Sequence, residues 1–546
     1  MKNQKTTDVF ARIATERLAQ RSHLLVEQQP LPFPDEVLPL DRQPGSSSFR
    51  PRNRRDTAAA LRAELERSRK RSARFLQRLA PELDTPRTVK PITTFDWRVE
   101  TQDDRHDFAG YTLAGEGEWE RVSIPHYGPP LGRAVTYYRT SVKVSRAMLQ
   151  KGSLWLSFDG VDYVAHVFFN GALVGSHEGF FASFECDVTA HARVGENVLL
   201  VKVENDVTSK DDGEKIFAAG GLGYDDPELG WHHCPPAMGI FQAVRIEARA
   251  RRFVRDLSVL TLDLDGNVEV YADVVSSDLE PADIAFEISV FGRNFKATPV
   301  SRMRHEPVTT QIRGHGDLDQ LAQPAVPQPA GRGSNIYRIP LSIKKPKIWD
   351  LDTPWLYQLQ VRLLEGDTAV DSAECQFGIR TFVQDEESTP KGRFLLNGRE
   401  IRLRGANTMG HLQQCVFRGN DAQLTDDILL AKIANMNFLR LTQRPVQREI
   451  YERCDQLGLM TQTDLPLFGT LKRNQTIEAV RQAGEMERLI RGHACSVIVS
   501  FMNEPFPNAS GQPHRHLTRE EMDVFFEMAR RAVQLENPAR VIKCCD

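Results

Sequence analysis

Apolar and polar residues alternate in short runs across residues 91–250. Runs such as YYRTSVKV (137–144) and NVLLVKVEN (197–205) repeat with the period of two that is typical of half-buried strands. The Asn-Gly pair at 170–171 lies between two further runs, and this pair favours the tight turn of a β-hairpin. The pattern therefore predicts an antiparallel β-sandwich of the jelly-roll kind over 91–250.

A second alternating block spans residues 251–383. Its strands lie within RDLSVLTLDLDGNVEVYADVV (255–275) and LYQLQVRLLEGDTAVDSAECQFGIRTF (356–382), and Asp-Gly at 265–266 marks a turn. The even spacing of the strands predicts an immunoglobulin-like β-sandwich. Residues 300–335 are polar and rich in Pro and Gly, so we expect a loop insertion there.

From residue 384 onward, short apolar strands alternate with amphipathic helices. Repeating β-α units predict parallel strands covered by helices, as in a (β/α)8 or TIM barrel. The units run out after about five strands, so the sequence predicts a truncated TIM barrel over 384–546. The expected strands are 401–407, 438–443, 459–464, 496–504 and 541–546, and the expected helices are 422–435, one with Pro445 in its first turn that ends near Leu457, 475–492 and 518–535.

Residues 1–90 differ from the rest of the chain in charge. They hold 19 Lys/Arg and 11 Asp/Glu, a net charge of +8. Residues 30–55 have the Pro- and Ser-rich composition of a linker, and residues 57–80 have a partial apolar stripe that predicts a helix. A nucleic-acid-binding arm is one interpretation, but acidic residues interleave the basic ones. A solvated helix that packs loosely on the following domain fits this composition better.

Composition limits the class of protein. The chain is 40% hydrophobic and 26% charged, with a formal net charge of −3, so it is neither largely disordered nor basic enough to suggest a nucleic-acid partner. No stretch approaches the roughly 18 apolar residues of a membrane span, and the first residues lack the apolar core of a secretory signal. None of the eight cysteines forms a CxxC pair. We therefore expect a cytoplasmic protein without a membrane partner.

Polar residues follow the predicted barrel strands. Asn407, Gln443, Asp464 and the Asn503-Glu504 pair each stand at the carboxyl end of one of the first four strands. Those ends form the active-site rim of a TIM barrel. Because four successive strands all end in polar residues, the sequence predicts a functional site at that rim.

The order jelly roll, immunoglobulin-like sandwich and β/α barrel resembles glycoside hydrolase family 2, which includes β-galactosidases, β-glucuronidases and β-mannosidases. The first sandwich, which resembles a sugar-binding domain, carries FDGVDYVAHVFFNGALVGSHEG, and the second ends with WDLDTPWLY and FGIRTF. The barrel opens with FLLNGREIRLRGAN and reaches SVIVSFMNEP. These motifs stand in the family's order over about residues 95–546.

The resemblance implies a retaining β-glycosidase that uses two carboxylates. Glu504, in the Asn-Glu pair at the end of strand 4, would be the acid/base. Asn503 would bind the sugar 2-hydroxyl, and Arg440 would neighbour the nucleophile. Asn407 and Asp464 would lie among the sugar contacts. The implied partner is a β-glycoside carbohydrate, with a homo-oligomer as a further possibility, and no cofactor, metal or nucleic acid is implied.

The sequence departs from the family pattern at positions that bear on sugar choice. Gln443 stands where the family often has His, and Met409 lies near another such position. His233 stands where a sandwich loop often supplies an aspartate, which Asp225 or Asp226 would then replace. His232, His233 and Cys234 could suggest a metal site. Because no second cluster of metal ligands accompanies them, we interpret them as loop residues.

The family nucleophile lies at the end of strand 7, beyond the five strands that the sequence predicts. Glu485 and Glu487 would not replace it, because both are expected on a helix outside the barrel. We therefore expect the sequence to be the amino-terminal portion of a longer enzyme and to be inactive alone, with a partner chain as the other explanation. The competing function is a non-catalytic carbohydrate-binding or scaffold protein with a decayed barrel.

Overall fold

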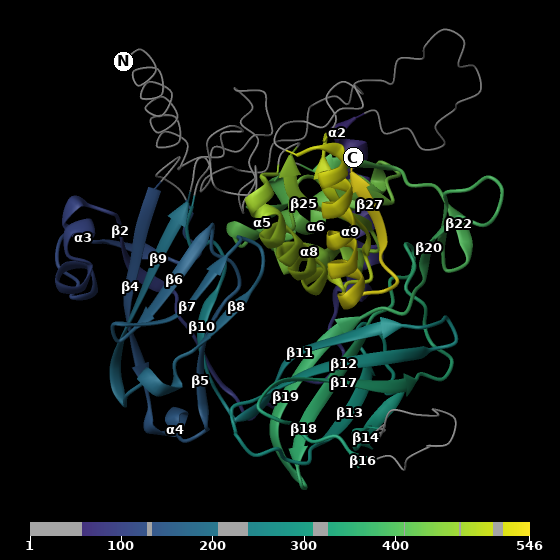
Figure 1. Ribbon diagram of the computed structural model, residues 1–546. Helices are drawn as coiled ribbons and strands as arrows, with labels where there is room; N and C mark the ends of the chain where they lie inside the picture. Colours follow the sequence, from purple (N-terminus) through teal and green to yellow (C-terminus); the bar gives the residue numbers. More distant parts are fainter. Residues whose placement is uncertain are drawn as a thin grey trace, which may run out of the picture.

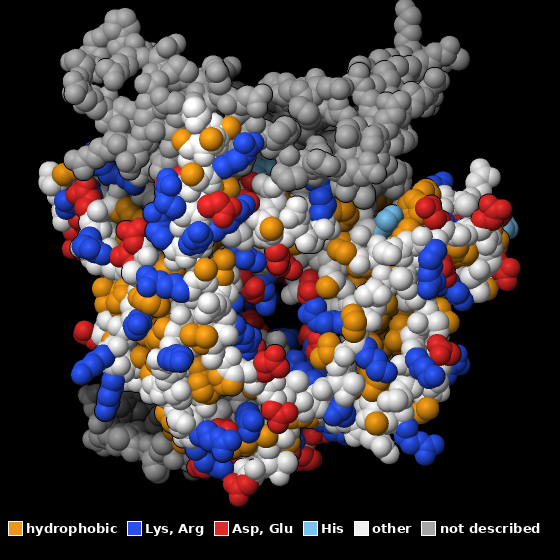
Figure 2. Space-filling model, turned by 180° about the vertical axis from the view of Figure 1, so that it is seen from behind, with side chains coloured by type: hydrophobic (Ala, Val, Ile, Leu, Met, Phe, Trp, Pro, Cys, Tyr) orange, Lys and Arg blue, Asp and Glu red, His pale blue; other side chains and the backbone are white. Residues whose placement is uncertain are grey.

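The computed structural model describes residues 57–127, 134–205, 238–309, 326–408, 410–468, 471–505 and 517–545. The chain forms one β-sandwich, then a second, then a parallel sheet covered by helices (Figure 1). Acidic and basic side chains intermix on the face shown in Figure 2. The predictions for the linker, for Asp225, Asp226 and His232–Cys234, and for Met409 lie outside the described residues.

The first sandwich has a six-stranded and a four-stranded sheet, with strand orders β3-β2-β4-β9-β6-β7 and β1-β10-β5-β8. All strand pairs are antiparallel, as predicted. Asn170 (φ 50°) and Gly171 (φ 84°) form the predicted hairpin turn. The elements are β1 (Thr88–Pro91), β2 (Thr94–Val99), α3 (Gln102–His106), η1 (Phe108–Leu113), β3 (Glu120–Ser123), β4 (Ala134–Val144), α4 (Arg146–Leu149), β5 (Ser153–Phe158), β6 (Val164–Phe169), β7 (Ala172–Glu178), β8 (Phe184–Asp187), η2 (Thr189–His191), β9 (Gly195–Asn205) and β10 (Val244–Arg249).

The second sandwich has sheets β11-β12-β17 and β14-β13-β18-β19 and a two-stranded β15-β16 pair. The loop predicted over 300–335 is wrong at both ends, because β14 pairs with β13 and β17 pairs with β12. Residues 310–325 lie outside the described part. The strands are β11 (Arg252–Thr261), β12 (Asn267–Ser276), β13 (Ala285–Gly292), β14 (Val300–His305), β15 (Val308–Thr309), β16 (Val326–Pro327), β17 (Gly333–Ser342), β18 (Tyr357–Glu365) and β19 (Thr368–Phe377).

The last region holds five parallel strands in chain order, β23 to β27. The predicted alternation of strands and helices is confirmed, and every residue of β26 is buried between helices and neighbouring strands. The elements are the hairpin strands β20 (Phe382–Asp385), β21 (Arg393–Leu396) and β22 (Arg399–Ile401), then β23 (Gly405–Thr408), α5 (His411–Phe417), α6 (Asp421–Ile433), β24 (Phe438–Leu441), α7 (Arg448–Leu457), β25 (Met460–Phe468), η4 (Arg473–Gln475), α8 (Thr476–Ile490), β26 (Ser496–Asn503), α9 (Arg519–Glu536) and β27 (Val541–Cys545).

Three details of this region correct the predictions. The strand expected at 401–407 is divided, since Ile401 ends a hairpin strand and the barrel strand begins at Gly405. Pro445 precedes α7 rather than lying in its first turn, because that helix begins at Arg448. The short helix α5 was not predicted. Among the described residues, no helix is long and apolar enough to cross a membrane.

The predicted helix near the amino end is α2 (Ala58–Leu76). It does not pack loosely on the first sandwich as expected. Arg69 Nε donates to Asp426 Oδ1 of α6 at 2.7 Å, and the Phe75 ring meets Trp355 edge-on at 5.1 Å. Leu65 and Phe75 are both buried. Because α2 contacts α6 through Arg69 and Trp355 through Phe75, it joins the barrel to the second sandwich.

Buried polar contacts fix the barrel on the second sandwich. Arg380 Nε donates to the Ala494 carbonyl at 3.0 Å, and its Nη2 donates to the Ser496 carbonyl at 2.7 Å. The indole of Trp349 donates to the Asp455 carbonyl at 2.8 Å. Arg380 therefore ties the second sandwich to the first residue of β26, the strand that precedes Glu504.

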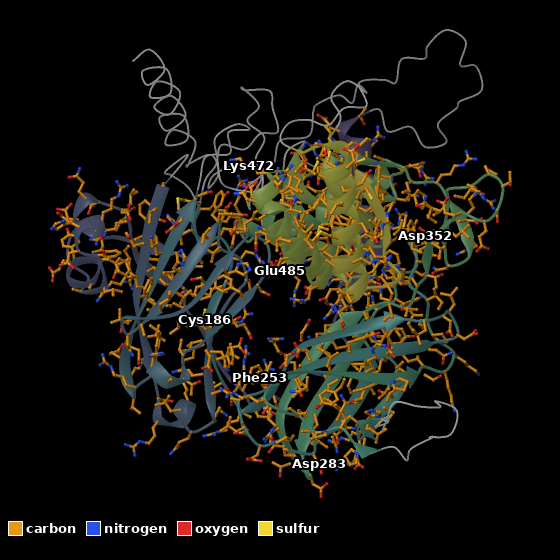
Figure 3. The ribbon with its side chains drawn as sticks, viewed as in Figure 1. Cys186, Phe253, Asp283, Asp352, Lys472 and Glu485 are labelled. Carbon is orange, nitrogen blue, oxygen red and sulfur yellow. The ribbon has the colours of Figure 1, made fainter. Side chains whose placement is uncertain are left out.

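The first sandwich meets the barrel through α8. Arg481 Nη2 donates to the Glu178 carbonyl at 2.7 Å, and His177 Nε2 lies 3.4 Å from Glu485 Oε1. Figure 3 marks Glu485 on the side of the barrel that faces the first sandwich. Glu485 thus serves a domain contact outside the barrel, in agreement with its predicted position on an outer helix.

Candidate active site

The parallel register brings the predicted residues to neighbouring strands. Asn407 on β23 stands opposite Arg440 on β24, and Arg440 stands opposite Gln462 on β25. Asn503 ends β26 opposite Phe468 of β25. The carboxyl ends of strands β23 to β26 therefore share one edge of the sheet, as the strand-end pattern predicted.

Arg440 joins three of these strands. Its Nε donates to Asp464 Oδ2 at 2.8 Å, and its Nη2 donates to Asn503 Oδ1 at 2.7 Å. The arginine side chain is 16% exposed and the aspartate side chain 3% exposed. A planar guanidinium that bonds two partners at once fixes both side chains.

Asp464 is the most enclosed carboxylate of the site. Its Oδ2 also accepts from the Gln443 backbone N–H at 3.0 Å, and its Oδ1 accepts from Gln462 Nε2 at 2.9 Å. Burial raises the pKa of Asp464, and the Arg440 guanidinium opposes that rise. Because donors from three directions hold its carboxylate, Asp464 positions Arg440 and the loop after β24.

The position of Asp464 in its strand differs from the prediction. We expected it to end the third strand, but β25 continues to Phe468. A register irregularity between Asp464 and Leu467 accompanies the extension. The aspartate therefore lies inside the sheet, whereas Asn503 lies at a true strand end.

Gln443 and Glu504 both have left-handed backbones, with φ of 61° and 48°. A non-glycine residue in this region costs about 1–3 kcal/mol, and such residues cluster at functional sites. Gln443 is buried two residues after β24, and Glu504 is exposed directly after β26. The two strained positions lie at the same edge as Arg440.

The structure thus brings Arg440, Asp464, Asn503 and the Gln443 backbone together by direct hydrogen bonds. Asn407 is exposed next to them in the strand register. Glu504 is linked to them through its neighbour Asn503. The chemical roles expected of these residues rest on the family resemblance and stay predictions.

Gln462 is a site residue that the sequence analysis missed. It is 5% exposed, and its amide orients the carboxylate of Asp464. The signal was present, because residues two apart on a strand point to the same face. A side chain that can donate hydrogen bonds, at that spacing from Asp464 on the same strand, indicates a partner for the carboxylate.

The loop after β24 is held in place by further buried contacts. Val446 N donates to the Tyr451 hydroxyl at 3.3 Å, and Gln447 Nε2 donates to the Gln413 carbonyl at 3.4 Å. These bonds tie the loop to α7 and α5. Gln443 is therefore presented on a rigid loop.

The donors and acceptors of the site are one arginine, several amides and two carboxylates. In the described part of the chain, no three His, Cys, Asp or Glu side chains gather into a group that could hold a metal ion. Arginine and amide groups donate hydrogen bonds to hydroxyl oxygens, and a carboxyl group can transfer a proton to one. The site is therefore equipped to bind and protonate an oxygen-rich substrate.

Two antiparallel sandwiches followed by parallel β-α units define a multidomain β/α-barrel protein with its polar site at the carboxyl ends of the strands, where barrel enzymes hold their active sites. Family models match in the same order. They are described as glycosyl hydrolase 2 galactose-binding domain-like (residues 131–225), glycosyl hydrolases family 2 (253–380) and glycosyl hydrolases family 2, TIM barrel domain (388–524). The chain belongs to glycoside hydrolase family 2.

Curated relatives include a putative β-glucuronidase of Formosa agariphila, 24% identical over 365 residues, and a β-galactosidase of Oenococcus oeni, 24% identical over 390 residues. These matches cover 64% and 70% of this chain. They cover 38% and 34% of the two relatives. The chain therefore spans little more than a third of the length of these relatives.

Solved structures share the fold. A Bacteroides uniformis β-glucuronidase superposes with a TM-score of 0.63 at 18% identity, covering 84% of this chain and 52% of the other. A β-D-mannosidase from Dictyoglomus thermophilum gives a TM-score of 0.64 at 18% identity, with 84% and 57% covered. At this identity the likeness establishes the arrangement of sandwiches and barrel.

Proposed function

We propose that this chain carries the acid/base half of a retaining β-glycosidase of the β-galactosidase or β-glucuronidase type. The observation that supports the proposal is the Asn503-Glu504 pair at the carboxyl end of β26, with Asn503 held by Arg440 at 2.7 Å. The names of the curated relatives support the substrate class, which is β-linked glycosides.

Glu504 would act in both steps of the double displacement. As an acid it protonates the glycosidic oxygen while the bond to the anomeric carbon breaks, so the leaving sugar departs as an alcohol. As a base it then takes a proton from the water that attacks the glycosyl-enzyme, which restores the acid for the next turnover. Its exposed side chain directly after β26 suits an approach to substrate oxygen.

Asn503 and Arg440 would hold the sugar in register with Glu504. Because Asn503 Oδ1 accepts from Arg440, its Nδ2 is the group that would donate to the sugar 2-hydroxyl. This contact strengthens as positive charge develops on the ring. Asn407 and Gln443 would contact other hydroxyls, and Asp464 would keep Arg440 in place.

The proposal also concerns the second carboxylate, which is the nucleophile of a retaining glycosidase. Among the described residues of β23 to β27 and those directly after each strand, Asp464 and Glu504 are the only carboxylates. The oxygens of Asp464 are already bonded to Arg440, Gln443 and Gln462. We place the nucleophile on a barrel strand beyond these five, so residues 1–546 alone would not hydrolyse glycosides.

The test uses the whole enzyme with Glu504→Ala. Hydrolysis of natural glycosides should fall severely, while aryl glycosides with good leaving groups should lose less, because their first step needs little protonation. External azide should restore the second step, since it attacks without a base. Glu527→Ala on α9 is the matched control and should retain full activity. Equal losses on both substrates without azide rescue would refute the acid/base role.

A further inference from the structure

The outer side of helix α2 carries a stripe of basic residues. Arg67, Lys70, Arg71 and Arg74 follow the i, i+3, i+4, i+7 spacing that places side chains on one side of a helix, and all four are exposed. The buried residues of α2 pack on the barrel and the second sandwich instead. Figure 2 shows the outer side, where blue side chains gather along α2. The helix therefore presents a positively charged surface to solvent.

Carboxylates compensate only part of this charge. Glu64 accepts from Arg67 Nη2 at 2.6 Å and from Arg71 Nη2 at 2.9 Å, so one carboxylate serves two arginines. In the part of the chain that the structure describes, no carboxylate pairs with Lys70 or Arg74. The stripe therefore keeps an excess of positive charge, although the whole chain has a formal net charge of −3.

Trp355 joins the stripe to a second group of basic residues on the second sandwich. The Arg74 guanidinium lies 5.5 Å from the centroid of the Trp355 ring, and Lys347 Nζ lies 4.0 Å from the same centroid. Lys344 and Lys345 precede Lys347, and all three lysines are exposed. We call the stripe and these three lysines together the α2 basic surface. It continues across the junction between α2 and the second sandwich.

The carboxyl end of α2 is also short of negative charge. Arg293 Nη1 is buried, and among the described residues it has no hydrogen-bond partner. Burial lowers the pKa of Arg293, and the charges of Arg78 and Arg453 lower it further, whereas Glu452 and Asp455 oppose the shift. Three guanidiniums thus lie close enough to repel one another. This repulsion favours the approach of an anionic group.

The α2 basic surface extends from the active-site edge of the barrel toward the second sandwich. Arg69 pairs with Asp426 in the first half of α6. Because α6 returns the chain from the carboxyl edge of β23 to the start of β24, its first half lies nearer that edge. At the other end of α2, Asn294 Nδ2 of the second sandwich donates to the Phe75 carbonyl at 3.3 Å. A ligand chain along α2 would therefore extend toward the edge that holds Glu504.

The ligand that fits this surface is a linear polyanion. Basic side chains recur about every 5.4 Å along a helix when one stands on each turn, which suits a chain of repeated negative charges. Proteins that bind single-stranded nucleic acid stack its bases on open aromatic faces. The Trp355 ring is already packed against Lys347, Phe75 and Phe295. The surface therefore offers charge without a stacking platform, which favours an acidic polysaccharide over a nucleic acid.

We propose that the α2 basic surface binds an acidic polysaccharide, a glycan whose carboxylate or sulfate groups recur along its chain. Lys70, Arg74 and Lys347 would contact successive anionic groups. The bound chain would lie outside the barrel and extend toward the active-site edge. The choice of a glycan rests in part on the proposed glycosidase function, whereas the charge of the surface is independent of it.

The experiment titrates residues 1–546 with polygalacturonate, dextran sulfate and uncharged dextran by calorimetry at several salt concentrations. Saturable binding of at least one acidic polymer that weakens with salt is expected, with no binding of dextran. Lys70→Gln with Arg74→Gln should raise the Kd by about tenfold and lower the salt slope by about one for each lost charge. Lys143→Gln with Arg146→Gln removes two exposed charges from the first sandwich and should leave the Kd unchanged.

Two further variants test the nature and the extent of the surface. Arg74→Lys keeps the charge and should keep the affinity, and a tenfold loss would overturn the charge-based contact. Lys347→Gln should raise the Kd by about threefold, and an unchanged Kd would overturn the continuation past Trp355. Thermal unfolding of each variant separates loss of binding from loss of fold.

The remaining arms decide the class of ligand and its relation to catalysis. An oligodeoxythymidylate of about 20 nucleotides should bind more weakly than the acidic glycan at the same salt concentration. Equal or tighter binding of this strand would overturn the choice of a glycan. Glu504→Ala should bind the polymers as the parent chain does, so a failed acid/base role leaves this test intact. The proposal is refuted if neither acidic polymer binds, or if the first-sandwich control variant loses as much affinity as the α2 variant.

Discussion

Arg440 Nη2 donates to Asn503 Oδ1 at 2.7 Å, although the two residues are 63 positions apart in the sequence. The contact joins the second barrel strand to the fourth and fixes the residue that directly precedes Glu504. It also sets the direction of the Asn503 amide group. The orientation of the proposed acid/base therefore depends on a buried network whose centre is Asp464.

The first prediction concerns Arg440→Lys in the whole enzyme. Lysine keeps the charge but cannot bond Asp464 and Asn503 with one planar group. We expect kcat/KM for a natural β-glycoside to fall by about tenfold to a hundredfold, with the larger effect on kcat. Steady-state kinetics measure both parameters. Arg531→Lys, exposed on α9, is the control, and a loss confined to KM would contradict the positioning role.

Much of the fold was predictable because strand and helix periods appear directly in the sequence. Alternation in residues 137–144 predicted β4, and the apolar run before Asn503 predicted β26. The strand-end rule placed Gln443 and Asn503 at one edge. Each of these inferences uses only the geometry of a single element.

The errors arise where contacts between elements decide the outcome. The strand predicted at 401–407 is split because Ile401 pairs with Phe394 in a hairpin. The extension of β25 past Asp464 depends on its pairing with β26. The docking of α2 depends on Asp426 and Trp355, which lie hundreds of residues later. A single sequence carries no signal for such partners.

The second prediction concerns sugar choice at Gln443. Asparagine tolerates the left-handed backbone at this position but has a shorter side chain, so Gln443→Asn tests the amide without strain. We expect the ratio of kcat/KM between galactoside and glucoside epimers to change by about threefold or more, since a lost hydrogen bond acts on one hydroxyl. An unchanged ratio places the Gln443 side chain outside the sugar subsite.

The third prediction concerns the buried pair between Glu487 on α8 and Arg540 before β27. Arg540 Nε donates to Glu487 Oε2 at 2.8 Å, and both side chains are at most 1% exposed. Glu487→Gln leaves the guanidinium without its counter-charge and should lower the free energy of unfolding by about 3–5 kcal/mol.

The matched variant for this pair is the double change Glu487→Gln with Arg540→Met. Removal of both charges should cost less than the single change, because no buried charge is left uncompensated. Urea denaturation followed by helical circular dichroism gives the four free energies of unfolding, for the parent chain, Glu487→Gln, Arg540→Met and the double variant. Additive losses in the double variant would show that the two groups do not interact.

The last prediction concerns pH and Lys432. Its Nζ donates to the carbonyls of Leu351 (2.5 Å), Leu457 (2.6 Å) and Gly458 (3.0 Å), which closes the carboxyl end of α7. Burial lowers the pKa of Lys432 to about 8 from the ordinary value of 10.5. Between these values the unfolded chain holds a proton that the folded chain has released.

Stability rises with pH wherever the unfolded state binds more protons. The cost of the buried charge is present in full below the folded pKa of about 8, and it disappears as the pH approaches 10.5. The free energy of unfolding of the parent chain should therefore rise by about 1–3 kcal/mol relative to Lys432→Met across that window. Urea titrations of both proteins, read by helical circular dichroism at matched pH, measure the difference. A constant difference at every pH would mean that Lys432 keeps its ordinary pKa in the folded protein.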